Sequence, residues 1–278
     1  MRLSRTVTVL GGDARQRYLA DALREKGCAV CTHAVPGVPD AEQTLASSLR
    51  TSDALILPLP AWSGDCIRGT ELTAQEVLSV VPPGTLLCGG KLSGVPLPAD
   101  CPVYDYGADE ALAVLNAVPT AEAAIALALE KLPYTLWESR VLVIGCGRIG
   151  KALAKRLLGL GSRVSVSCRK AADAAWCRSI GCTSEKTGAY REPLSVYRCI
   201  FNTVPAPVFT EKQLAEVLPD CPILDLASFP GGLPEGLTPP TGYAPAPALP
   251  GRLFTATAGA LICDAVLEQL HRMEVSHV

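Results

Sequence analysis

The amino-acid sequence predicts an α/β fold with two domains, each built around a parallel β-sheet. Apolar segments of strand length alternate with amphipathic segments of helix length in both halves of the chain, a pattern typical of parallel sheets with helices on their faces. A glycine-rich turn, Gly145-x-Gly147-x-x-Gly150, follows an apolar run in the middle of the chain. The length of 278 residues suits two domains.

The first domain is expected to cover residues 1–118. Its strands are expected at 6–10, 28–33, 54–57, 85–88 and 103–104, and its helices at 14–26, 40–50 and 71–81. Gly11-Gly12 resembles half of a phosphate-binding loop, and Asp13 is a candidate N-cap for the helix that follows. Pro119, followed by Glu122, predicts the start of a connecting helix at 119–132.

The second domain is expected at residues 138–250. Its strands are expected at 141–144, 164–168, 199–202, 223–226 and 243–244, with a helix directly after the glycine-rich turn. A last helix, 256–273, is expected to pack back on the first domain. The prediction is therefore two Rossmann-like or flavodoxin-like parallel-sheet domains joined by a long helix.

Composition limits the kind of partner that this chain can have. Hydrophobic residues make up 49% of the chain and charged residues 19%, with a net charge of −2 and no basic cluster, so nucleic acid is not expected as a partner. The longest apolar stretch, 111–132, is interrupted by polar residues and by proline, and the apolar N-terminal stretch stops at Leu10. We therefore expect no membrane span, no signal peptide and a cytoplasmic location.

The twelve cysteines are scattered, mostly within apolar segments. Cys28 and Cys31 form the one CxxC pair, but residues three apart on a strand point to opposite faces. Since no second CxxC pair and no histidine completes a zinc site with them, we expect free thiols in a reducing cytosol and no metal site.

The glycine-rich turn is a dinucleotide fingerprint in the right context of strand, turn and helix. Gly145 allows the sharp turn, Gly147 leaves room for a pyrophosphate, and Gly150 lets the helix pack on the strand. The helix N-terminus offers unpaired N–H groups and the positive end of its dipole to the phosphates. Arg148 and Ile149 lie inside the fingerprint, and Arg148 could add a phosphate contact.

The end of the next strand favours NADP over NAD. A carboxylate at this position would bind both ribose hydroxyls, but here Arg169-Lys170 follows the strand and the first carboxylate is Asp173. Two cations and the hydroxyl of Ser167 suit a 2′-phosphate. The alternative is that Arg169 and Lys170 only solvate the start of a helix.

Other strand ends are predicted to line the same cleft, because ligands of α/β proteins bind outside the carboxyl ends of the strands. The predicted further cofactor contacts are Thr203, Val204, Pro205, Leu226, Ala227 and Ser228. On the substrate side, the candidates for catalysis and binding are Arg15, Ser63, Thr120 and Glu122. The guanidinium of Arg15 is suited to binding a carboxylate through two parallel hydrogen bonds.

Histidines are few, and none is placed for acid–base catalysis in this cleft. His33 lies near the end of the second strand, and His271 and His277 lie at the C-terminus. Hydroxyacid oxidation needs a positioned acid or base, usually histidine. The sequence therefore favours a redox step that needs little acid–base assistance.

Several segments together resemble the A subunits of dipicolinate synthase. The segments that carry the resemblance are 11–16 (GGDARQ), 56–58 (ILP), 118–122 (VPTAE), 145–150 (GCGRIG), 224–228 (LDLAS) with 230–232 (PGG), and 249–251 (LPG) with 257–259 (TAG). They occur in the expected order over nearly the whole chain. As a set they are specific, whereas the glycine fingerprint alone would not be.

The resemblance implies NADP-dependent oxidation of dihydrodipicolinate to dipicolinate in the mother cell of a sporulating bacterium. It also implies that the partner is the flavoprotein-like B subunit of dipicolinate synthase, and we expect a homo-oligomer. Arg15, Ser63, Thr120 and Ser228 would then hold the two substrate carboxylates, and Glu122 or a water would take a proton. Two alternatives stay open: another NAD(P)-dependent amino-acid or hydroxyacid dehydrogenase, and a non-catalytic NADP-binding subunit.

Overall fold

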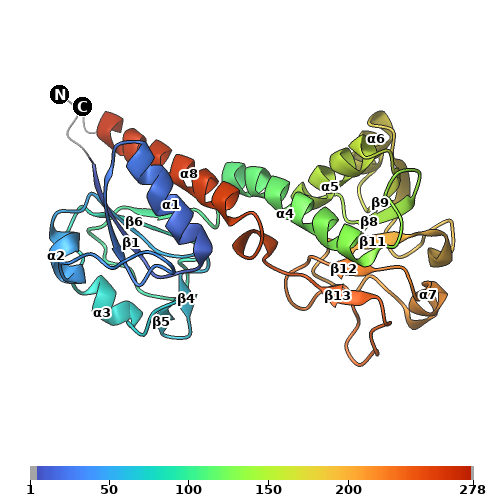
Figure 1. Cartoon of the computed structure of the whole chain (residues 1–278), viewed down its shortest axis with the longest axis horizontal. Coiled ribbons are helices and arrows are strands. Elements are labelled where there is room, and N and C mark those ends of the chain that lie inside the picture. The colour runs from blue at the N-terminus through green and yellow to red at the C-terminus, as the bar shows by residue number, and fades with distance from the viewer. Residues whose placement is uncertain (1–4, 277–278) are drawn as a thin grey trace. The chain divides into compact units, whose positions relative to one another are not determined.

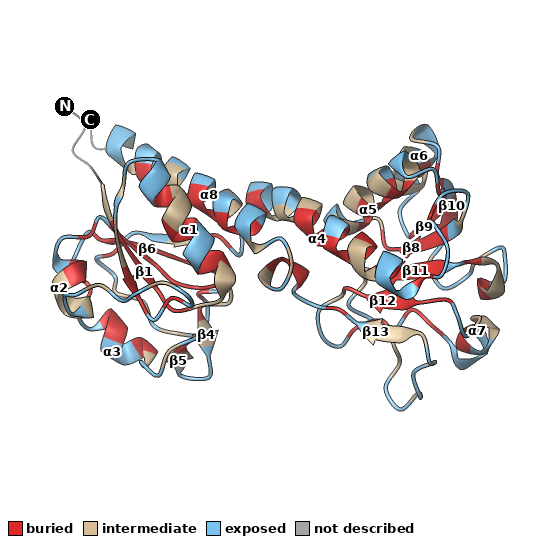
Figure 2. Cartoon of the chain, viewed as in Figure 1, coloured by how far each residue is buried: buried red, intermediate tan, exposed pale blue. Residues whose placement is uncertain are grey.

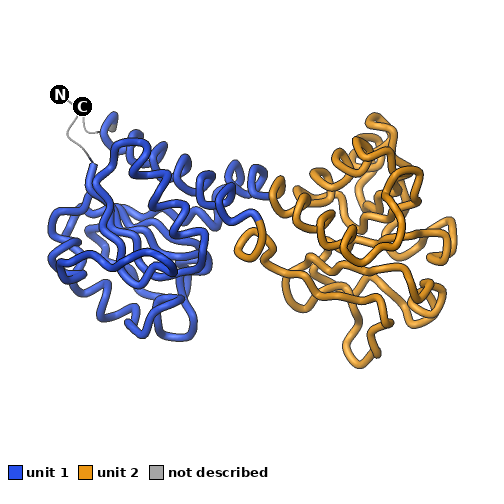
Figure 3. Tube along the Cα trace, viewed as in Figure 1, with its two compact units in different colours: residues 1–116, 254–278 blue, residues 117–253 orange. Residues whose placement is uncertain are grey.

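The computed structural model describes residues 5–276 and divides them into two compact units (Figures 1 and 3). Unit 1 comprises residues up to 116 and from 254 onward, and unit 2 comprises residues 117–253. Each unit is an α/β structure around a parallel sheet. The predicted fold class is confirmed.

The main sheet of unit 1 has five parallel strands. They are β1 (Thr6–Leu10), β2 (Ala29–His33), β3 (Ala54–Ile56), β6 (Leu86–Gly89) and β7 (Val103–Asp105), in the order β2-β1-β3-β6-β7. This is the flavodoxin-like order, which reverses direction between β1 and β3. A small hairpin of β4 (Trp62–Ser63) and β5 (Cys66–Ile67) lies in the connection after β3, where the sequence predicts no strand.

The helices α2 (Leu45–Arg50) and α3 (Ala74–Leu78) are shorter than predicted. Each begins where a threonine caps it: Thr44 accepts a hydrogen bond from the Ser47 N–H, and Thr73 accepts one from the Glu76 N–H. A side chain that satisfies the N–H groups of the first turn sets the start of a helix. The polar residues before each cap therefore stay outside the helix.

The C-terminal helix α8 (Thr255–Ser276) packs on α1 (Ala14–Glu25), as predicted (Figure 1). The buried side chains that α8 contributes to the core of unit 1 are Ile262, Cys263, Val266 and Leu270, and they cluster with Leu19 and Leu23 of α1. Gly259 allows the close approach, because a Cβ there would lie 2.6 Å from the Arg15 carbonyl oxygen and 2.8 Å from the Leu19 nitrogen.

The long helix α4 (Glu110–Lys131) begins earlier than the predicted start at Pro119. The Leu112 N–H donates to the Asp109 carboxylate at 2.9 Å, so Asp109 caps the helix, and Pro119 lies inside it. By length and composition α4 is the one helix of the described part of the chain that could cross a membrane. Half of its most apolar window is buried, and Ala121, Ala124 and Ala128 lie in the core of unit 2, as in a core helix (Figure 2).

Unit 2 contains a six-stranded parallel sheet in the Rossmann order, which reverses between β8 and β11. Its strands are β8 (Arg140–Ile144), β9 (Arg163–Cys168), β10 (Thr183–Lys186), β11 (Cys199–Asn202), β12 (Ile223–Asp225) and β13 (Tyr243–Pro245), in the order β10-β9-β8-β11-β12-β13. Its further helices are α5 (Arg148–Gly159), α6 (Ala171–Ser179) and α7 (Glu211–Glu216). The sequence did not predict α6, α7 or β10, because α6 and α7 are short and β10 (TSEK) has no apolar run.

Candidate dinucleotide site and substrate edges

The turn between β8 and α5 has the geometry that a dinucleotide fingerprint requires. Gly145 has a φ of 101°, and a Cβ there would overlap the Thr203 hydroxyl. A Cβ on Gly150 would overlap the Gly145 carbonyl oxygen, whereas a Cβ on Gly147 would meet nothing within 4 Å. Gly145 and Gly150 are therefore needed to build the turn, and Gly147 leaves open space beside the backbone.

The N-terminus of α5 faces that open space. Gly147 is its N-cap and provides no side-chain hydrogen bond. The N–H groups of the first turn can therefore be offered to an anion, together with the positive end of the helix dipole. Arg148 is exposed at this end and Ile149 is half-buried. A pyrophosphate fits these residues in both shape and charge.

At the end of β9, the charged groups are cations. Arg169 and Lys170 are both exposed. The carboxylate of Asp173 lies 3.2 Å from the Lys151 ammonium on α5, so the first carboxylate after the strand is held in an ion pair. Ser167, by contrast, is fully buried and shares a 3.2 Å hydrogen bond with the Thr187 hydroxyl. The cationic character of this strand end comes from Arg169 and Lys170, and Ser167 lies in the interior.

The loop after β11 is tied to its own strand and to β8. The Thr203 hydroxyl donates to the Ile144 carbonyl oxygen at 2.8 Å. The Asn202 side chain bonds both backbone groups of Val204, accepting from its N–H and donating to its carbonyl oxygen, each at 3.0 Å. Pro205 is exposed just beyond. These bonds place Thr203, Val204 and Pro205 beside the glycine-rich turn.

A buried carboxylate organises the loop after β12. Asp225 is 3% exposed and accepts hydrogen bonds from the Asn202 amide at 2.8 Å, the Ala227 N–H at 3.1 Å and the Gly232 N–H at 2.7 Å. The hydroxyl of Tyr243 is a fourth donor. Burial, and then the bond to Asp225, raise the pKa of Tyr243, so the phenol remains protonated and donates. Both ends of the 227–232 loop are thus held by one side chain.

Sequence reasoning did not identify Asn202 and Asp225 as functional residues. They are paired in register at the ends of β11 and β12. The available signal was a polar residue in the last position of each of two otherwise apolar strands. Leu226 is buried, Ala227 is half-buried and Ser228 is exposed in the loop that Asp225 holds.

In unit 1 the N–H groups of the Gly11-Gly12 turn are already hydrogen-bonded within the protein. The Gly11 N–H donates to the His33 carbonyl oxygen at 2.9 Å, and the Gly12 N–H donates to the Arg68 carbonyl oxygen at 2.7 Å. Asp13 caps α1, as the sequence suggested. The resemblance of Gly11-Gly12 to a phosphate loop is therefore misleading, because these N–H groups already bind carbonyl oxygens.

Arg15 is buried and makes its contacts within the protein. Its Nε and Nη2 donate to the two Asp13 carboxylate oxygens at 2.8 and 2.7 Å, and Nη2 also donates to the Leu59 carbonyl oxygen at 2.7 Å. Burial alone would raise the pKa of Asp13, but the hydrogen bonds and charge of Arg15, with the charge of Arg68, hold that pKa below its ordinary value. Arg15 therefore links the β1–α1 turn to the loop after β3.

We expect Arg15→Met to destabilise the fold by about 1–3 kcal/mol at neutral pH, because it leaves the carboxylate of Asp13 without its partner. The Asp13 side chain is 24% exposed, so the loss should be smaller than for a fully buried pair. The folded-state pKa of Asp13 is lowered, so this stabilisation is present above the unfolded pKa and is lost as pH falls through the folded pKa. Urea unfolding at several pH values measures it.

The matched control is Arg24→Met, which removes the exposed pair of Arg24 with Asp21 and should change stability little at any pH. A deficit of the Arg15 variant that stayed constant from neutral pH to about pH 3, below the ordinary aspartate pKa, would contradict the linkage.

The other substrate candidates are divided between the units. Arg15 and Ser63 belong to unit 1, and Thr120 and Glu122 belong to unit 2. Ser63 is exposed in the β4–β5 hairpin and Thr120 is buried on α4. Glu122 is exposed on α4, and its Oε1 accepts from Nε of Arg156 on α5 at 3.0 Å. The four candidates therefore come from three separate elements, α1, β4 and α4.

The described histidines and the cysteines form no metal site. His33 is buried, lies 2.8 Å from the Ser48 hydroxyl and has its pKa lowered by burial. His271 lies on α8, and His277 is outside the described residues. All twelve cysteines are free. In residues 5–276 no group of three His, Cys, Asp or Glu side chains is arranged to hold a metal ion.

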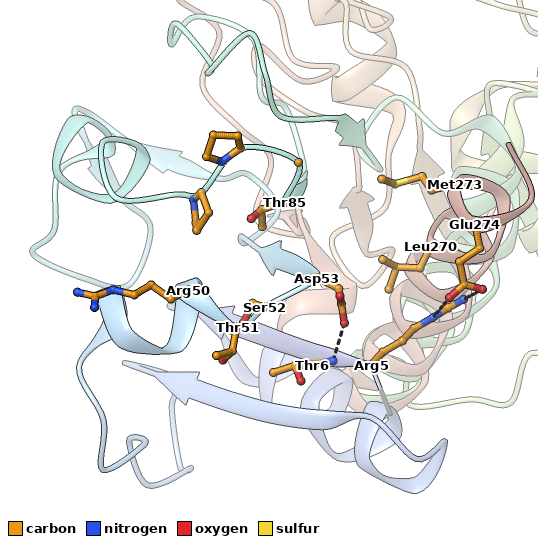
Figure 4. A pocket seen from close by; sticks show the side chains of 13 residues that line it. Arg5, Thr6, Arg50, Thr51, Ser52, Asp53, Thr85, Leu270, Met273 and Glu274 are labelled. Carbon is orange, nitrogen blue, oxygen red and sulfur yellow. Dashed lines mark hydrogen bonds and ion pairs between the residues drawn. The ribbon is translucent and has the colours of Figure 1, made fainter. Parts of the chain in front are cut away.

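A cavity of about 680 Å³ lies at the opposite edge of the unit 1 sheet, where the strands begin (Figure 4). Three of the charged groups on its wall are paired within the protein: Arg5 lies 2.7 Å from Glu274, and Asp53 accepts from the Thr6 N–H at 2.8 Å. Ligands of α/β proteins bind at the carboxyl ends of the strands. The edge where the cavity lies is therefore not the one at which a dinucleotide is expected.

Comparison with known proteins agrees with these features. Residues 6–94 match the family model for the N-terminal domain of the dipicolinate synthase A subunit. The dipicolinate synthase A subunit of Bacillus subtilis (strain 168) is 26% identical over 289 aligned residues, covering 96% of this chain and 96% of that protein. This similarity extends through both units.

Solved structures show the same fold. The A chain of dipicolinate synthase from Bacillus subtilis has a TM-score of 0.78 at 25% identity over 99% of both chains. The A subunit from Bacillus halodurans has a TM-score of 0.80 at 23% identity, covering 96% of this chain and 97% of that one. A transhydrogenase from Sinorhizobium meliloti has a TM-score of 0.67 at 18% identity, covering 96% of this chain and 84% of that one, which shows a shared fold.

The Rossmann order of the second sheet, the open Gly147 turn and the full-length similarity lead to one assignment. The transhydrogenase shares this fold, as does a phosphoglycerate oxidoreductase from Vibrio cholerae, with a TM-score of 0.54 at 14% identity. This chain is similar along its whole length to dipicolinate synthase A subunits, and residues 6–94 match the model of their N-terminal domain.

Proposed function

We propose that this chain oxidises dihydrodipicolinate to dipicolinate with NADP⁺ as the hydride acceptor, together with the B subunit of dipicolinate synthase. The observation that carries the proposal is the β8–α5 turn, which is closed to a Cβ at Gly145 and Gly150 but open at Gly147. Similarity to the dipicolinate synthase A subunit over 96% of the chain supports the substrate. By the same argument we place the protein, as a homo-oligomer, in the mother-cell cytoplasm of a sporulating bacterium.

The residues of unit 2 have separate roles in this proposal. The backbone of 145–150 holds the pyrophosphate, with Arg148 and Ile149 at its edge, and Arg169 and Lys170 bind the 2′-phosphate. Thr203, Val204 and Pro205, with Leu226 and Ala227, line the nicotinamide side. Ser167 supports this site from the interior through its hydrogen bond to Thr187. When bound, NADP⁺ supplies the hydride acceptor.

The proposed oxidation needs no strong general acid or base from the protein. The substrate loses one hydride and one proton as its ring becomes pyridine-2,6-dicarboxylate, and the aromaticity gained favours that change. The protein mainly has to orient the ring and exclude water. We propose that Ser63, Thr120 and Ser228 bind the carboxylates and that Glu122, or a water, takes the proton. Arg15 acts through its bonds to Asp13 and Leu59, which shape the unit 1 edge.

The direct test mixes the purified chain, alone and in the presence of the B subunit, with NADP⁺ and freshly generated dihydrodipicolinate. NADPH and dipicolinate should appear together in equal amounts. Binding of NADP⁺ without turnover in either mixture would instead indicate a non-catalytic NADP-binding subunit. Turnover of an amino acid or a hydroxyacid, but not of dihydrodipicolinate, would indicate a different dehydrogenase on the same scaffold.

Cofactor preference gives a sharper test of the end of β9. We expect Arg169→Ser combined with Lys170→Ser to weaken NADP⁺ binding by about 10- to 100-fold, because one or two charge-assisted phosphate contacts are lost. NAD⁺ binding should change little. Calorimetric titration with both nucleotides measures the ratio, and Arg178→Ser, an exposed charge in the last turn of α6, is the control. Equal losses for both nucleotides would contradict a 2′-phosphate role.

A further inference from the structure

Phe229 is the most exposed of the large apolar side chains in the described chain. It is 97% exposed, and the next most exposed, Trp137, is 67% exposed. Phe229 lies in the loop directly after β12, at the carboxyl edge of the unit 2 sheet, where α/β proteins bind their ligands. A single exposed apolar residue is ordinary on a surface, but here it lies in a loop whose base is held firmly.

The base of this loop is fixed by Asp225. The Ala227 N–H and the Gly232 N–H, one at each end of the loop, donate to the two oxygens of this one buried carboxylate. The Gly231 N–H also donates to the Ser228 carbonyl oxygen at 2.9 Å, which closes a turn around Phe229. The aromatic ring is therefore presented to solvent from a braced turn, and little backbone ordering is needed when a ligand covers it.

The strand order indicates which ligand would lie there. β8 carries the glycine-rich turn, β11 is its neighbour, and β12 follows β11. Neighbouring strands are about 4.8 Å apart, so a cofactor whose pyrophosphate lies over β8 extends past β11 toward β12. In the proposed function, the molecule to be oxidised would lie beyond the nicotinamide, on the side of the loop after β12.

We propose that Phe229 contacts the ring of the substrate and thereby selects an unsaturated six-membered ring. This inference rests on the proposed function and adds a specificity-determining residue to it. A phenyl ring can lie against the flat, unsaturated part of a dihydropyridine and against the aromatic product ring, and it covers apolar surface on both partners. The exposed hydroxyl of Ser228, the preceding residue, lies next to it and can bind a carboxylate of the same molecule.

The test compares Phe229→Ala, Phe229→Tyr and wild type, each in the presence of the B subunit. Phe229→Ala should raise the KM for dihydrodipicolinate about tenfold and leave the Kd for NADP⁺ unchanged, because burial and stacking of a phenyl ring are lost. Phe229→Tyr keeps the ring and should stay within about threefold of wild type. Trp137→Leu, which removes an exposed aromatic residue before β8, should change neither constant.

Each outcome separates the inference from the function on which it rests. An unchanged KM in the Ala variant, with wild-type turnover intact, overturns the role of Phe229 and leaves the proposed function standing. If NADP⁺ binding weakened by the same factor by which KM rose, the inference would also be overturned, because the ring would then act on the cofactor or on the loop. Absence of turnover in wild type removes the proposed function, and the inference with it.

Discussion

Gly147→Ala should lower the affinity for NADP(H) by at least about 100-fold and leave the fold intact. An added Cβ meets no protein atom within 4 Å, and the backbone angles of φ −82° and ψ −165° are open to alanine. Replacing glycine by alanine at an N-cap costs at most about 1 kcal/mol. The new methyl group would project beside the backbone that a pyrophosphate has to approach. Calorimetric titration and thermal unfolding measure the two effects separately.

Two other glycines serve as matched comparisons. Gly150→Ala should lose both stability and binding, because its Cβ would overlap a backbone carbonyl oxygen that cannot rotate away. Gly159→Ala, at the other end of the same helix, meets nothing within 4 Å and should stabilise the protein by up to about 1 kcal/mol with normal NADP binding. Normal NADP affinity in a stable Gly147→Ala variant would contradict a pyrophosphate site on this turn.

Asp225→Ala should be among the most destabilising substitutions in unit 2, by roughly 3 kcal/mol or more. It leaves the Asn202 amide, the Ala227 and Gly232 N–H groups and the Tyr243 hydroxyl without their shared acceptor. Asp225→Asn should cost less, because its one remaining oxygen still accepts hydrogen bonds. It should still destabilise the protein, because the new NH2 group faces other donors. Urea unfolding measures the free energy of unfolding in each variant.

The control is Asp220→Ala, which removes an exposed carboxylate bonded to Tyr134 and should change stability by about 1 kcal/mol or less. If Asp225→Ala unfolded at the same urea concentration as wild type, the loops after β11 and β12 would not depend on this carboxylate. In that case Phe229 would also lack the fixed base that the substrate contact requires.

Local patterns predicted most of the architecture. The run Val-Leu-Val-Ile before Gly145 predicted β8, and the spacing of Gly145, Gly147 and Gly150 predicted the turn and the start of α5. These elements depend on near neighbours in the chain, because strand alternation, helix periodicity and turn geometry are properties of short segments. The start of α4 was predicted too late, since the cap that sets it is the single residue Asp109.

Contacts between distant segments were not predictable from such patterns. Arg15 looked available for a substrate carboxylate, but Asp13 and the Leu59 carbonyl oxygen occupy it. Gly12 looked ready for a phosphate, but it binds the Arg68 carbonyl oxygen. Ser167 was predicted to suit a 2′-phosphate, but it is buried against Thr187. Leu59, Arg68 and Thr187 are brought close by the folding of each unit, whereas Asp13 is only two residues from Arg15 and pairs with it in the same turn.

The sequence by itself determined the fold class, the place of the dinucleotide turn and the cationic end of β9, because each follows from residue types at fixed local spacing. Tertiary structure alone decided that Asp225 and Asn202 hold the two loops at the carboxyl edge, and that a Cβ on Gly145 or Gly150 would overlap Thr203 or the Gly145 carbonyl oxygen. The reason is physical. A hydrogen bond or a steric overlap depends on distances of a few ångströms between segments, and only folding brings those segments together.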